Sequence, residues 1–390
     1  MNASRYPIPA MPTMPLTSLL PRRQRALPAP FDDESVSFWF SARIALWQAA
    51  RALGLQRGDT IAVPAFCCGS EIEPFEHAGL RLRFFGLNAK LDPDPESFSE
   101  ALIGADAALV THYFGFPASL KHARAECDAR DVPLIEDCAH ALYAKSSEGL
   151  VGTIGDASVF SFRKTIALSD GAALRVANPK VPITSEREAA PSKVVRGRMR
   201  RLVAHAFHSS SSAPLRLALR SAVASKHLLE RRPPTVEQGV TEEATEELYE
   251  DIRFKPERSE CNISASAERM FRATNHVGIE RARRHNYAQI APVVAEHESL
   301  RPLFEQLPAG ASPLFFPIVV QNPFALREHM LTYRIGVKHI WPWFLEGIPW
   351  DDYPSEVELK RTVLGLPVHQ CLGANELARI VTALGEWNGS

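Results

Sequence analysis

The chain is 390 residues long, which is more than one small hydrophobic core needs and suits a large domain with a smaller one. Its 45% hydrophobic and 23% charged residues are ordinary for a folded protein, and the formal net charge of -1 gives no global signal for a nucleic-acid partner. None of the six cysteines forms a CxxC pair or a Cys/His cluster with zinc-site spacing, so we expect no metal site. Scattered thiols, the lack of a signal-peptide pattern and the lack of a membrane-length apolar stretch predict a cytoplasmic protein.

A mainly parallel α/β sheet is predicted by the first half of the chain. A proline-rich lead over residues 1–35 precedes apolar residues at helical spacing in 36–54, which predict a helix that stops at Gly54. Short apolar runs follow, some of them separated by helical segments such as residues 117–131. In such sheets ligands sit at the carboxyl ends of the strands. The runs are GDTIAVPAF (58–66), LRLRFFGL (80–87), AALVTHYFG (107–115) and VPLIEDCAH (132–140).

Residues 180–255 break this alternation with two blocks of opposite charge. Ten basic residues and one acidic residue occur between Lys193 and Arg232, and seven acidic residues with no basic one follow between Glu237 and Asp251. The two blocks can pair as a helical hairpin. We interpret 180–255 as a solvated, charged helical insertion, in preference to a membrane-surface or anionic-substrate patch at 193–232.

The C-terminal part predicts a smaller α+β domain. Residues 264–297 predict one long helix, LFFPIVV at 314–320 a strand, and ELARIVTALGEW at 376–387 a closing helix. The predicted division is therefore a lead over 1–35, a large domain over 36–255 and a small domain over 256–390.

Two strand ends carry residues suited to chemistry on an aldehyde cofactor. Asp137 can pair with a protonated ring nitrogen, as the acid does in pyridoxal phosphate (PLP) chemistry, or it can cap a helix. Lys164 can form an imine with an aldehyde and move protons at a substrate carbon. An isolated lysine is more often a surface charge, so the signal lies in its position after Ser161-Phe162 and ahead of residues 170–172, Asp-Gly-Ala. His112, also at a strand end, suits a structural or a catalytic role.

The order of the motifs resembles the DegT/DnrJ/EryC1/StrS family of PLP-dependent aminotransferases. The resemblance runs from about Ser41 to the C-terminus and is weakest in 180–255. It implies the fold-type I architecture, PLP as cofactor, a homodimer with shared active sites, and amino transfer from glutamate or glutamine to a nucleotide-linked keto-sugar. The motifs are SARIAL, GDTIAVPAF, THYFGFP, IEDCAH, GDASVFSFRK, DGAAL and LGLPVHQCL.

Roles follow from this resemblance position by position. Lys164 resembles the Schiff-base lysine, and Asp137 resembles the partner of the pyridine nitrogen. His140 matches the polar residue that lies against the cofactor ring, and Ser161 matches a serine that binds the cofactor phosphate. Asn262 resembles the asparagine that the neighbouring subunit offers to the phosphate, although the arginine that usually follows is absent here.

Three departures from the family pattern surround Lys164. The family places two more residues between its Ser-Phe pair and the lysine, and the retained spacing from the lysine to Asp-Gly-Ala favours a short deletion. The phosphate loop reads Ser41-Ala42-Arg43 where the family has Ser-Gly-Thr, and we expect Arg43 to replace the lost hydroxyl with a charge-assisted fork rather than to serve as a surface residue. The ring-stacking position falls on Cys68, which leaves Phe66 or Tyr113 as substitutes if the loop is rearranged.

The predicted activity is PLP-dependent amino transfer onto a ketone, with Lys164 as the catalytic residue. The lysine also excludes the dehydratase branch of the family, in which a histidine takes its place. Two alternatives stay open. One is a PLP enzyme of another outcome, such as elimination, racemisation or carbon–carbon chemistry, and the other is a non-catalytic regulatory protein that keeps the fold. The aromatics Trp341, Trp343 and Trp350 suit either an acceptor pocket or a buried core.

Overall fold

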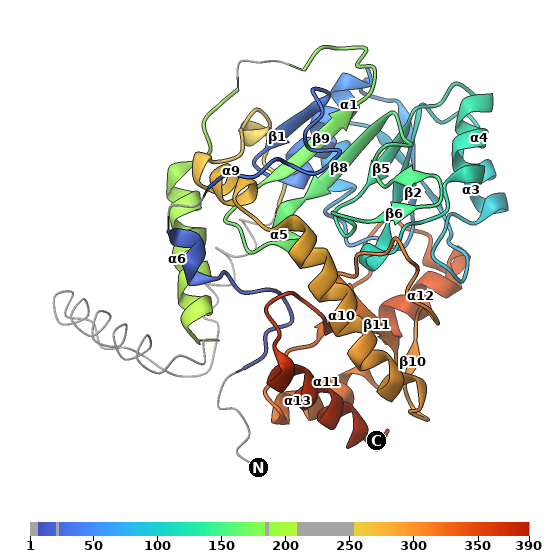
Figure 1. The fold of residues 1–390 in the computed structure, drawn as a ribbon. Helices are drawn as coiled ribbons and strands as arrows, with labels where there is room; N and C mark the ends of the chain where they lie inside the picture. Colours follow the sequence, from blue (N-terminus) through green and yellow to red (C-terminus); the bar gives the residue numbers. More distant parts are fainter. Residues whose placement is uncertain (1–6, 21–22, 184–186, 209–252, 390) are drawn as a thin grey trace, which may run out of the picture.

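The computed structural model describes residues 7–20, 23–183, 187–208 and 253–389 (Figure 1). Its largest element is a seven-stranded sheet with strands β1 (Val36–Trp39), β2 (Thr60–Pro64), β3 (Arg81–Phe85), β4 (Ala107–Thr111), β5 (Leu134–Asp137), β8 (Ala157–Ser161) and β9 (Ala172–Val176). The strand order is β1-β9-β8-β5-β4-β2-β3. Every neighbouring pair from β8 to β3 is parallel, and only β9 runs against its neighbours. The predicted mainly parallel α/β sheet is confirmed.

Helices cover both faces of this sheet because its central strands alternate between two apolar clusters. Ile61 and Val63 of β2 face the cluster that α1 (Ala42–Ala52) completes, and Ala62 between them faces the opposite cluster. That second cluster contains buried residues of α3 (Pro95–Ala101) and α4 (Lys121–Ala129). The short α2 (Glu73–His77) contacts α1 and β3. Burial on both faces explains why the strands are continuous apolar runs.

The expected helix over 36–54 begins later than predicted. Residues 36–39 form β1, an edge strand paired antiparallel with β9, and the helix starts only after Ser41, whose hydroxyl accepts a hydrogen bond from the Ile44 amide. Gly54 follows the helix at φ +80°, a left-handed conformation that glycine tolerates best. The prediction of a helix from residue 36 was therefore wrong, because the helical spacing of the apolar residues does not distinguish the short strand and the serine cap that precede the helix.

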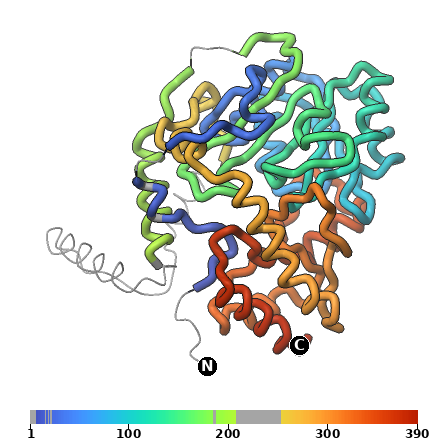
Figure 2. Tube along the Cα trace, in the orientation of Figure 1, coloured from blue at the N-terminus to red at the C-terminus, as the bar shows by residue number. Residues whose placement is uncertain are grey.

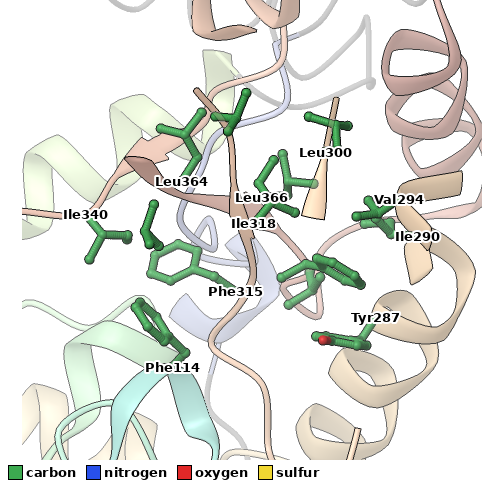
Figure 3. Packing of buried hydrophobic residues seen from close by; sticks show 14 of the residues in the cluster. Phe114, Tyr287, Ile290, Val294, Leu300, Phe315, Ile318, Ile340, Leu364 and Leu366 are labelled. Carbon is green, nitrogen blue, oxygen red and sulfur yellow. The ribbon is translucent and has the colours of Figure 1, made fainter. Parts of the chain in front are cut away.

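A second, antiparallel sheet lies beside the first and has the order β10-β11-β13-β12. The apolar cluster around it includes Phe114, which belongs to η2 (Tyr113–Gly115) after β4 of the large sheet (Figure 3). The carboxyl end of β4 is thus packed directly on the small sheet. The remaining elements of this part are β10 (Arg301–Pro302), β11 (Phe315–Val319), β12 (Lys338–His339), β13 (Val363–Pro367), α11 (Pro323–Thr332), η4 (Trp350–Asp352), α12 (Pro354–Thr362) and α13 (Ala374–Gly385).

The predicted long helix over 264–297 is two helices. They are α9 (Ala265–Arg272) and α10 (His276–Ala295), and they are separated by residues 273–275. Ser264 caps the first helix by accepting from the Ala267 amide, and Asn275 caps the second by accepting from the Gly278 amide. Since Asn275 is a second start signal inside one periodic segment, the prediction of a single helix was wrong.

The proline-rich lead and part of the charged insertion pack against the two sheets and their helices. The lead runs from the small sheet, where Ile8 pairs with Ile335, past η1 (Leu16–Leu19) to β1 (Figure 2). Helix α6 (Ser192–His208) is the helix of the insertion among the described residues, and the predicted pairing with the acidic block lies outside them. Within the described ranges, no helix has the length and apolar character needed to cross a membrane.

Candidate active site

Adjacent parallel strands bring the predicted acid and lysine to one edge of the large sheet. Strand β5 ends at Asp137, and its neighbour β8 ends at Ser161 and continues into the short helix α5 (Phe162–Thr165), which carries Lys164. His140 follows Asp137 in the turn after β5. The positive charge of Lys164 lowers the pKa of both Asp137 and His140. The structure therefore groups Lys164, Asp137 and His140 as the sequence predicts.

Asp137 is buried, with 6% of its surface exposed, and one of its oxygens is fixed by a hydrogen bond. Its Oδ1 accepts from the Ala139 amide at 2.9 Å. Burial raises the pKa of Asp137 from 3.8 to about 6, against the favourable charge of Lys164 and together with the negative charge of Glu71. The carboxylate is therefore ionised at neutral pH and ready to pair with a positive partner.

His140 is neutral, and its ring contacts both the Phe114 amide and the ring of Trp341. Its Nδ1 accepts from the Phe114 amide at 3.3 Å, so Nε2 carries the proton. Burial holds the pKa of His140 well below its ordinary value, and the charge of Lys164 lowers it further. The ring of Trp341, from the C-terminal part of the chain, stacks on that of His140 with centroids 5.5 Å apart. Neutral His140 thus offers one N–H donor at the site.

The residues expected to hold a phosphate differ in their neighbours and hydrogen-bond partners. Ser161 is buried at the start of α5 and makes no capping hydrogen bond there. Ala42 is the first residue of α1, where backbone amides lack intrahelical partners and favour anions. Arg43 forms an ion pair with Glu73 of α2, with Nε and Oε2 3.2 Å apart. Its predicted phosphate contact therefore stays a prediction.

Asn262 lies beside the edge strand β1. It forms a bridge with Trp39, and its Oδ1 accepts from Nη1 of Arg187 at 3.2 Å. Its expected role concerns a neighbouring subunit and stays a prediction, as do the phosphate roles of Ala42 and Ser161.

The loop after β2 replaces the expected stacking aromatic with a hydrogen-bonded thiol. The thiol of Cys68 contacts Ser70 Oγ and Glu71 Oε2, each at 2.8 Å, and its amide donates to Glu71 Oε1 at 3.0 Å. Phe66 and Tyr113 are enclosed in the core, where the Tyr113 hydroxyl donates to the Phe66 carbonyl at 2.7 Å. Both rings are therefore packed among core side chains, and their role as stacking partners stays a prediction.

Two buried cations that sequence reasoning missed connect the C-terminal part to this site. Arg283 of α10 donates to the carbonyls of Thr165, Pro313 and Leu314 and thereby holds the end of α5. Lys360 of α12 donates to the carbonyls of Cys67 at 2.7 Å and Trp341 at 3.3 Å. For Arg283, helical spacing was the one available signal of burial. It lies four residues after Ile279, on the buried face of α10 that continues with Ile290.

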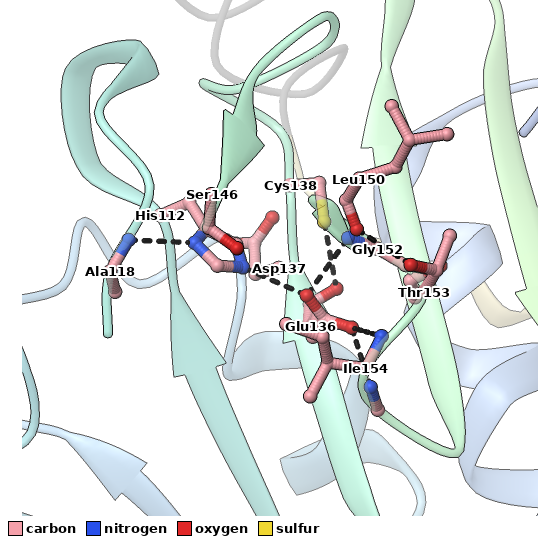
Figure 4. A network of polar contacts seen from close by, with 12 residues as sticks. His112, Ala118, Glu136, Asp137, Cys138, Ser146, Leu150, Gly152, Thr153 and Ile154 are labelled. Atoms are coloured by element: carbon pink, nitrogen blue, oxygen red, sulfur yellow. Dashed lines mark hydrogen bonds and ion pairs between the residues drawn. The ribbon is translucent and has the colours of Figure 1, made fainter. Parts of the chain in front are cut away.

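His112 has a structural role. Its Nδ1 accepts from the Ala118 amide at 3.0 Å, so its Nε2 donates to Glu136 Oε2 at 3.0 Å (Figure 4). Possible ligand atoms of His112, Glu136 and Cys138 lie within 4.8 Å of one another. However, the Glu136 carboxylate also accepts from three backbone amides, and the Cys138 thiol donates to the Glu136 carbonyl. These hydrogen bonds account for the cluster as a brace between strands β4 and β5.

A mainly parallel sheet packed on a smaller antiparallel sheet is the fold of fold-type I PLP-dependent aminotransferases. The aminotransferase TlmJ from Streptoalloteichus hindustanus superposes with a TM-score of 0.62 at 19% identity, over 90% of this chain and 85% of its own. A candidate sugar aminotransferase from Streptococcus pneumoniae, solved in its PLP form, superposes with a TM-score of 0.66 at 15% identity, over 97% and 98%. These similarities confirm the predicted fold class.

Residues 37–187 match the model of the DegT/DnrJ/EryC1/StrS aminotransferase family, which confirms the family resemblance. Among curated proteins, GDP-perosamine synthase of Vibrio cholerae is 31% identical over 132 residues. That match covers 33% of this chain and 36% of the relative, so the chain spans about a third of the length of the relative it matches. The segment 37–187 that matches the family model contains Asp137, His140, Ser161 and Lys164.

Proposed function

We propose that the protein is a PLP-dependent aminotransferase that moves an amino group from a small-molecule donor, such as glutamate, to a keto acceptor. The observation that carries the proposal is the grouping of Lys164, Asp137 and His140 at the carboxyl ends of adjacent parallel strands. The sugar-modifying relatives support a nucleotide-linked keto-sugar as the acceptor.

The residues at this edge fit PLP in charge and in hydrogen-bonding capacity. Asp137 is an ionised, oriented carboxylate suited to a protonated pyridine nitrogen, and neutral His140 supplies an N–H donor. Ser161 and the amide end of α1 suit the phosphate group. When bound, PLP supplies an electron sink for the carbon that loses or gains a proton.

The chain contributes proton transfer and electrostatic support to the reaction. Lys164 anchors the cofactor and then moves a proton at the substrate carbon through its amine. Asp137 retains its charge during this step and so holds the proton on the pyridine nitrogen. Burial raises the pKa of Asp137 to about 6 in the chain alone. A positively charged partner would lower this pKa again and so stabilise the ionised form.

The proposal includes a wider organisation of the molecule. Residues 36–255 form the PLP-binding domain, 256–390 the small domain, and 1–35 a lead that precedes both. Two chains form a homodimer, in which Asn262 of one chain reaches the cofactor phosphate in the other. The position of Asn262 beside β1, the edge strand of the sheet, supports this arrangement.

Substitution of Lys164 by alanine tests the proposal. Amino transfer from glutamate, followed as conversion of the cofactor absorbance, should fall by about 10²–10⁴-fold or more, because the proton carrier is lost. Borohydride reduction of the wild-type protein with PLP should label Lys164. The matched control is Lys121→Ala at the exposed start of α4, which should keep both signals.

Three results would contradict the proposal. Labelling of another lysine, or retained turnover in Lys164→Ala without added amine, would remove the assigned catalyst. Failure of the wild-type protein to take up PLP would favour the non-catalytic alternative, and PLP uptake with elimination products only would favour other PLP chemistry.

A further inference from the structure

The helix that carries Lys164 is too short to hold its own position. Helix α5 has four residues, and its single turn is closed by a backbone hydrogen bond from the Ile166 amide to the Phe162 carbonyl at 2.7 Å. A helix of one turn is not stable alone, because one hydrogen bond does not offset the ordering of its backbone. The position of Lys164 therefore depends on contacts that the rest of the chain makes with the two ends of α5.

At the end of α5, the carbonyl that follows Lys164 accepts hydrogen bonds from two side chains. Thr165 is buried, and its carbonyl oxygen accepts from Arg283 Nη2 at 3.1 Å and from Gln370 Nε2 at 3.0 Å. The two donors are themselves joined, since Arg283 Nε donates to Gln370 Oε1 at 2.9 Å. Gln370 thus supports α5 twice, as a donor to the carbonyl and as an acceptor that orients the arginine.

Gln370 belongs to the segment 368–371, which directly follows β13 and is fixed on α10. Asn286 Nδ2 of α10 donates to the carbonyls of Val368 and His369, at 3.2 Å and 2.9 Å. Since Arg283 is on the same helix, α10 holds both the backbone of this segment and the side chain of Gln370.

The residues on either side of Gln370 bind the proline-rich lead. His369 Nε2 donates to the Pro9 carbonyl at 3.0 Å, and the Cys371 thiol donates to the Thr13 carbonyl at 3.3 Å. Burial lowers the pKa of His369 to about 4, so its ring is a neutral donor at neutral pH. Three consecutive side chains therefore join the lead to the end of the lysine-bearing helix.

The lead also reaches the start of α5. The ring of Phe31 makes an edge-to-face contact with the ring of Phe162, the first residue of α5, with centroids 5.7 Å apart. Phe31 contacts Phe160 of β8 in the same way, at 4.9 Å. The lead is therefore connected to both ends of the turn that presents Lys164, directly at Phe162 and through segment 368–371 at Thr165.

We propose that Gln370 is a positioning residue for Lys164, and that the lead, bound by His369 and Cys371, completes the support of the lysine-bearing helix. Gln370 acts through the carbonyl of Thr165, the residue next to the lysine, and needs no contact with the substrate. The inference deepens the proposed function and rests on it for the reaction that Lys164 performs.

Two substitutions separate the two parts of this support. Gln370→Leu removes the donor to Thr165, and His369→Phe removes the donor to the lead while it keeps a ring. In the protein with PLP, the absorbance of the cofactor bound to Lys164 is titrated with pH. Both variants should shift the midpoint by about half a pH unit or more, because a lost buried hydrogen bond changes how the lysine is held.

Matched controls come from exposed positions on α10. Gln289→Leu and His285→Phe make the same chemical changes there and should titrate as the wild type does. Circular dichroism verifies that each variant is folded. If Gln370→Leu misfolds, Gln370→Glu takes its place, because it keeps the acceptor for Arg283 and loses only the donor to Thr165.

The reactivity of the Lys164 amine tests the same inference without PLP. Acetylation by an N-hydroxysuccinimide ester, read by mass spectrometry, compares Lys164 with the exposed Lys121 of the same sample. The ratio should rise about fivefold in Gln370→Leu, the factor that one lost buried hydrogen bond gives, and should also rise in His369→Phe.

Each contrary result has a separate meaning. An unchanged midpoint and an unchanged ratio in Gln370→Leu would overturn the positioning role of Gln370. Effects of Gln370→Leu without any effect of His369→Phe would overturn the role of the lead. A wild-type protein that takes up no PLP, but whose acetylation ratio responds to both substitutions, would overturn the proposed function alone.

Discussion

Asp137 is held in the folded chain under conditions that disfavour its charge. Burial raises its pKa from 3.8 to about 6, so the folded state binds a proton more tightly than the unfolded state does. Stability therefore decreases as pH rises from about 4 to about 6 and stays at the lower level above that range. A buried carboxylate whose charge destabilises the folded state is common at sites that bind a positively charged partner.

Replacement of Asp137 by asparagine should stabilise the protein without PLP at pH 8 by about 1–2 kcal/mol, because the neutral amide avoids the cost of a buried charge. The gain should shrink toward pH 4, where the wild-type carboxyl is already neutral in the folded state. Urea unfolding at both pH values measures the effect, with Asp32→Asn at an exposed position as control. A variant less stable than the wild type at pH 8 would show that the carboxylate has a stabilising partner in the chain.

The pKa of Glu136, one residue earlier, is shifted in the opposite direction. Burial disfavours its charge, yet the hydrogen bonds from His112 and from the amides of Gly155 and Gly152 hold its pKa below the ordinary value. Its stabilising contribution is present above the unfolded pKa and is lost as pH falls through the lower, folded value. The two neighbouring acids on one strand thus differ in pKa because Glu136 accepts from His112 and three backbone amides, whereas Asp137 accepts from one amide.

The sequence predicted those site residues that directly follow a strand. Lys164, Asp137 and His140 could be placed because parallel strands end at a common edge. Glu71 and Arg283 could not, since each meets the site through a loop or a helix distant in sequence. No periodicity or local motif specifies such contacts, which depend on how the two sheets pack.

At the scale of elements, α10 positions the lysine-bearing helix α5 through Arg283. Arg283 is 1% exposed, and its guanidinium donates to the Thr165 carbonyl at the end of α5 and to two carbonyls before β11. Burial lowers the pKa of Arg283 to about 10, which still leaves it charged at neutral pH. One side chain therefore joins α5, α10 and the small sheet.

Substitution of Arg283 by methionine should destabilise the protein by roughly 2 kcal/mol or more, because three buried carbonyls lose a charged donor. It should also weaken PLP uptake, since the end of α5 is no longer held. Chemical unfolding and PLP absorbance measure the two effects. Arg281→Met, on the exposed face of the same helix, is the control. An unchanged PLP affinity in a stable Arg283→Met protein would show that α5 is positioned by other contacts.

Apolar runs predicted the strands of the large sheet well because those strands are buried on both faces. The elements that the sequence misplaced have weaker signals. The strand β1 lies at the sheet edge and continues almost directly into α1, and the α9–α10 break depends on the Asn275 cap. Local capping chemistry overrode apolar periodicity at both places.

At the scale of the whole molecule, the lead joins the small sheet to the core of the large one. Ile8 pairs with Ile335 near the small sheet. Phe31 then makes edge-to-face contacts with Phe160, Phe162 and Phe271, next to the helix that carries Lys164. The proline-rich lead is therefore part of the packed structure.

Removal of the Phe31 ring should reveal this contribution. Phe31→Ala should lower the free energy of unfolding by about 3–4 kcal/mol, because it leaves a cavity among three aromatic rings. Phe324→Ala, at a ring that is 70% exposed, should change it little. Chemical unfolding of both variants provides the measurement. A loss below about 1 kcal/mol in Phe31→Ala would mean that the lead is only loosely attached.

The path of the lead also sets an order of events during translation. Its first described contacts, Ile8 with Ile335 and the Pro9 carbonyl with His369, join residues that are made more than 300 positions apart. The large sheet can assemble while the ribosome still makes the small one, but the start of the lead, at Ile8, must wait for more than 300 further residues before it can dock. Until then Ile8 lacks its native partner, whereas Phe31 of the same lead can already pack on Phe160 and Phe162.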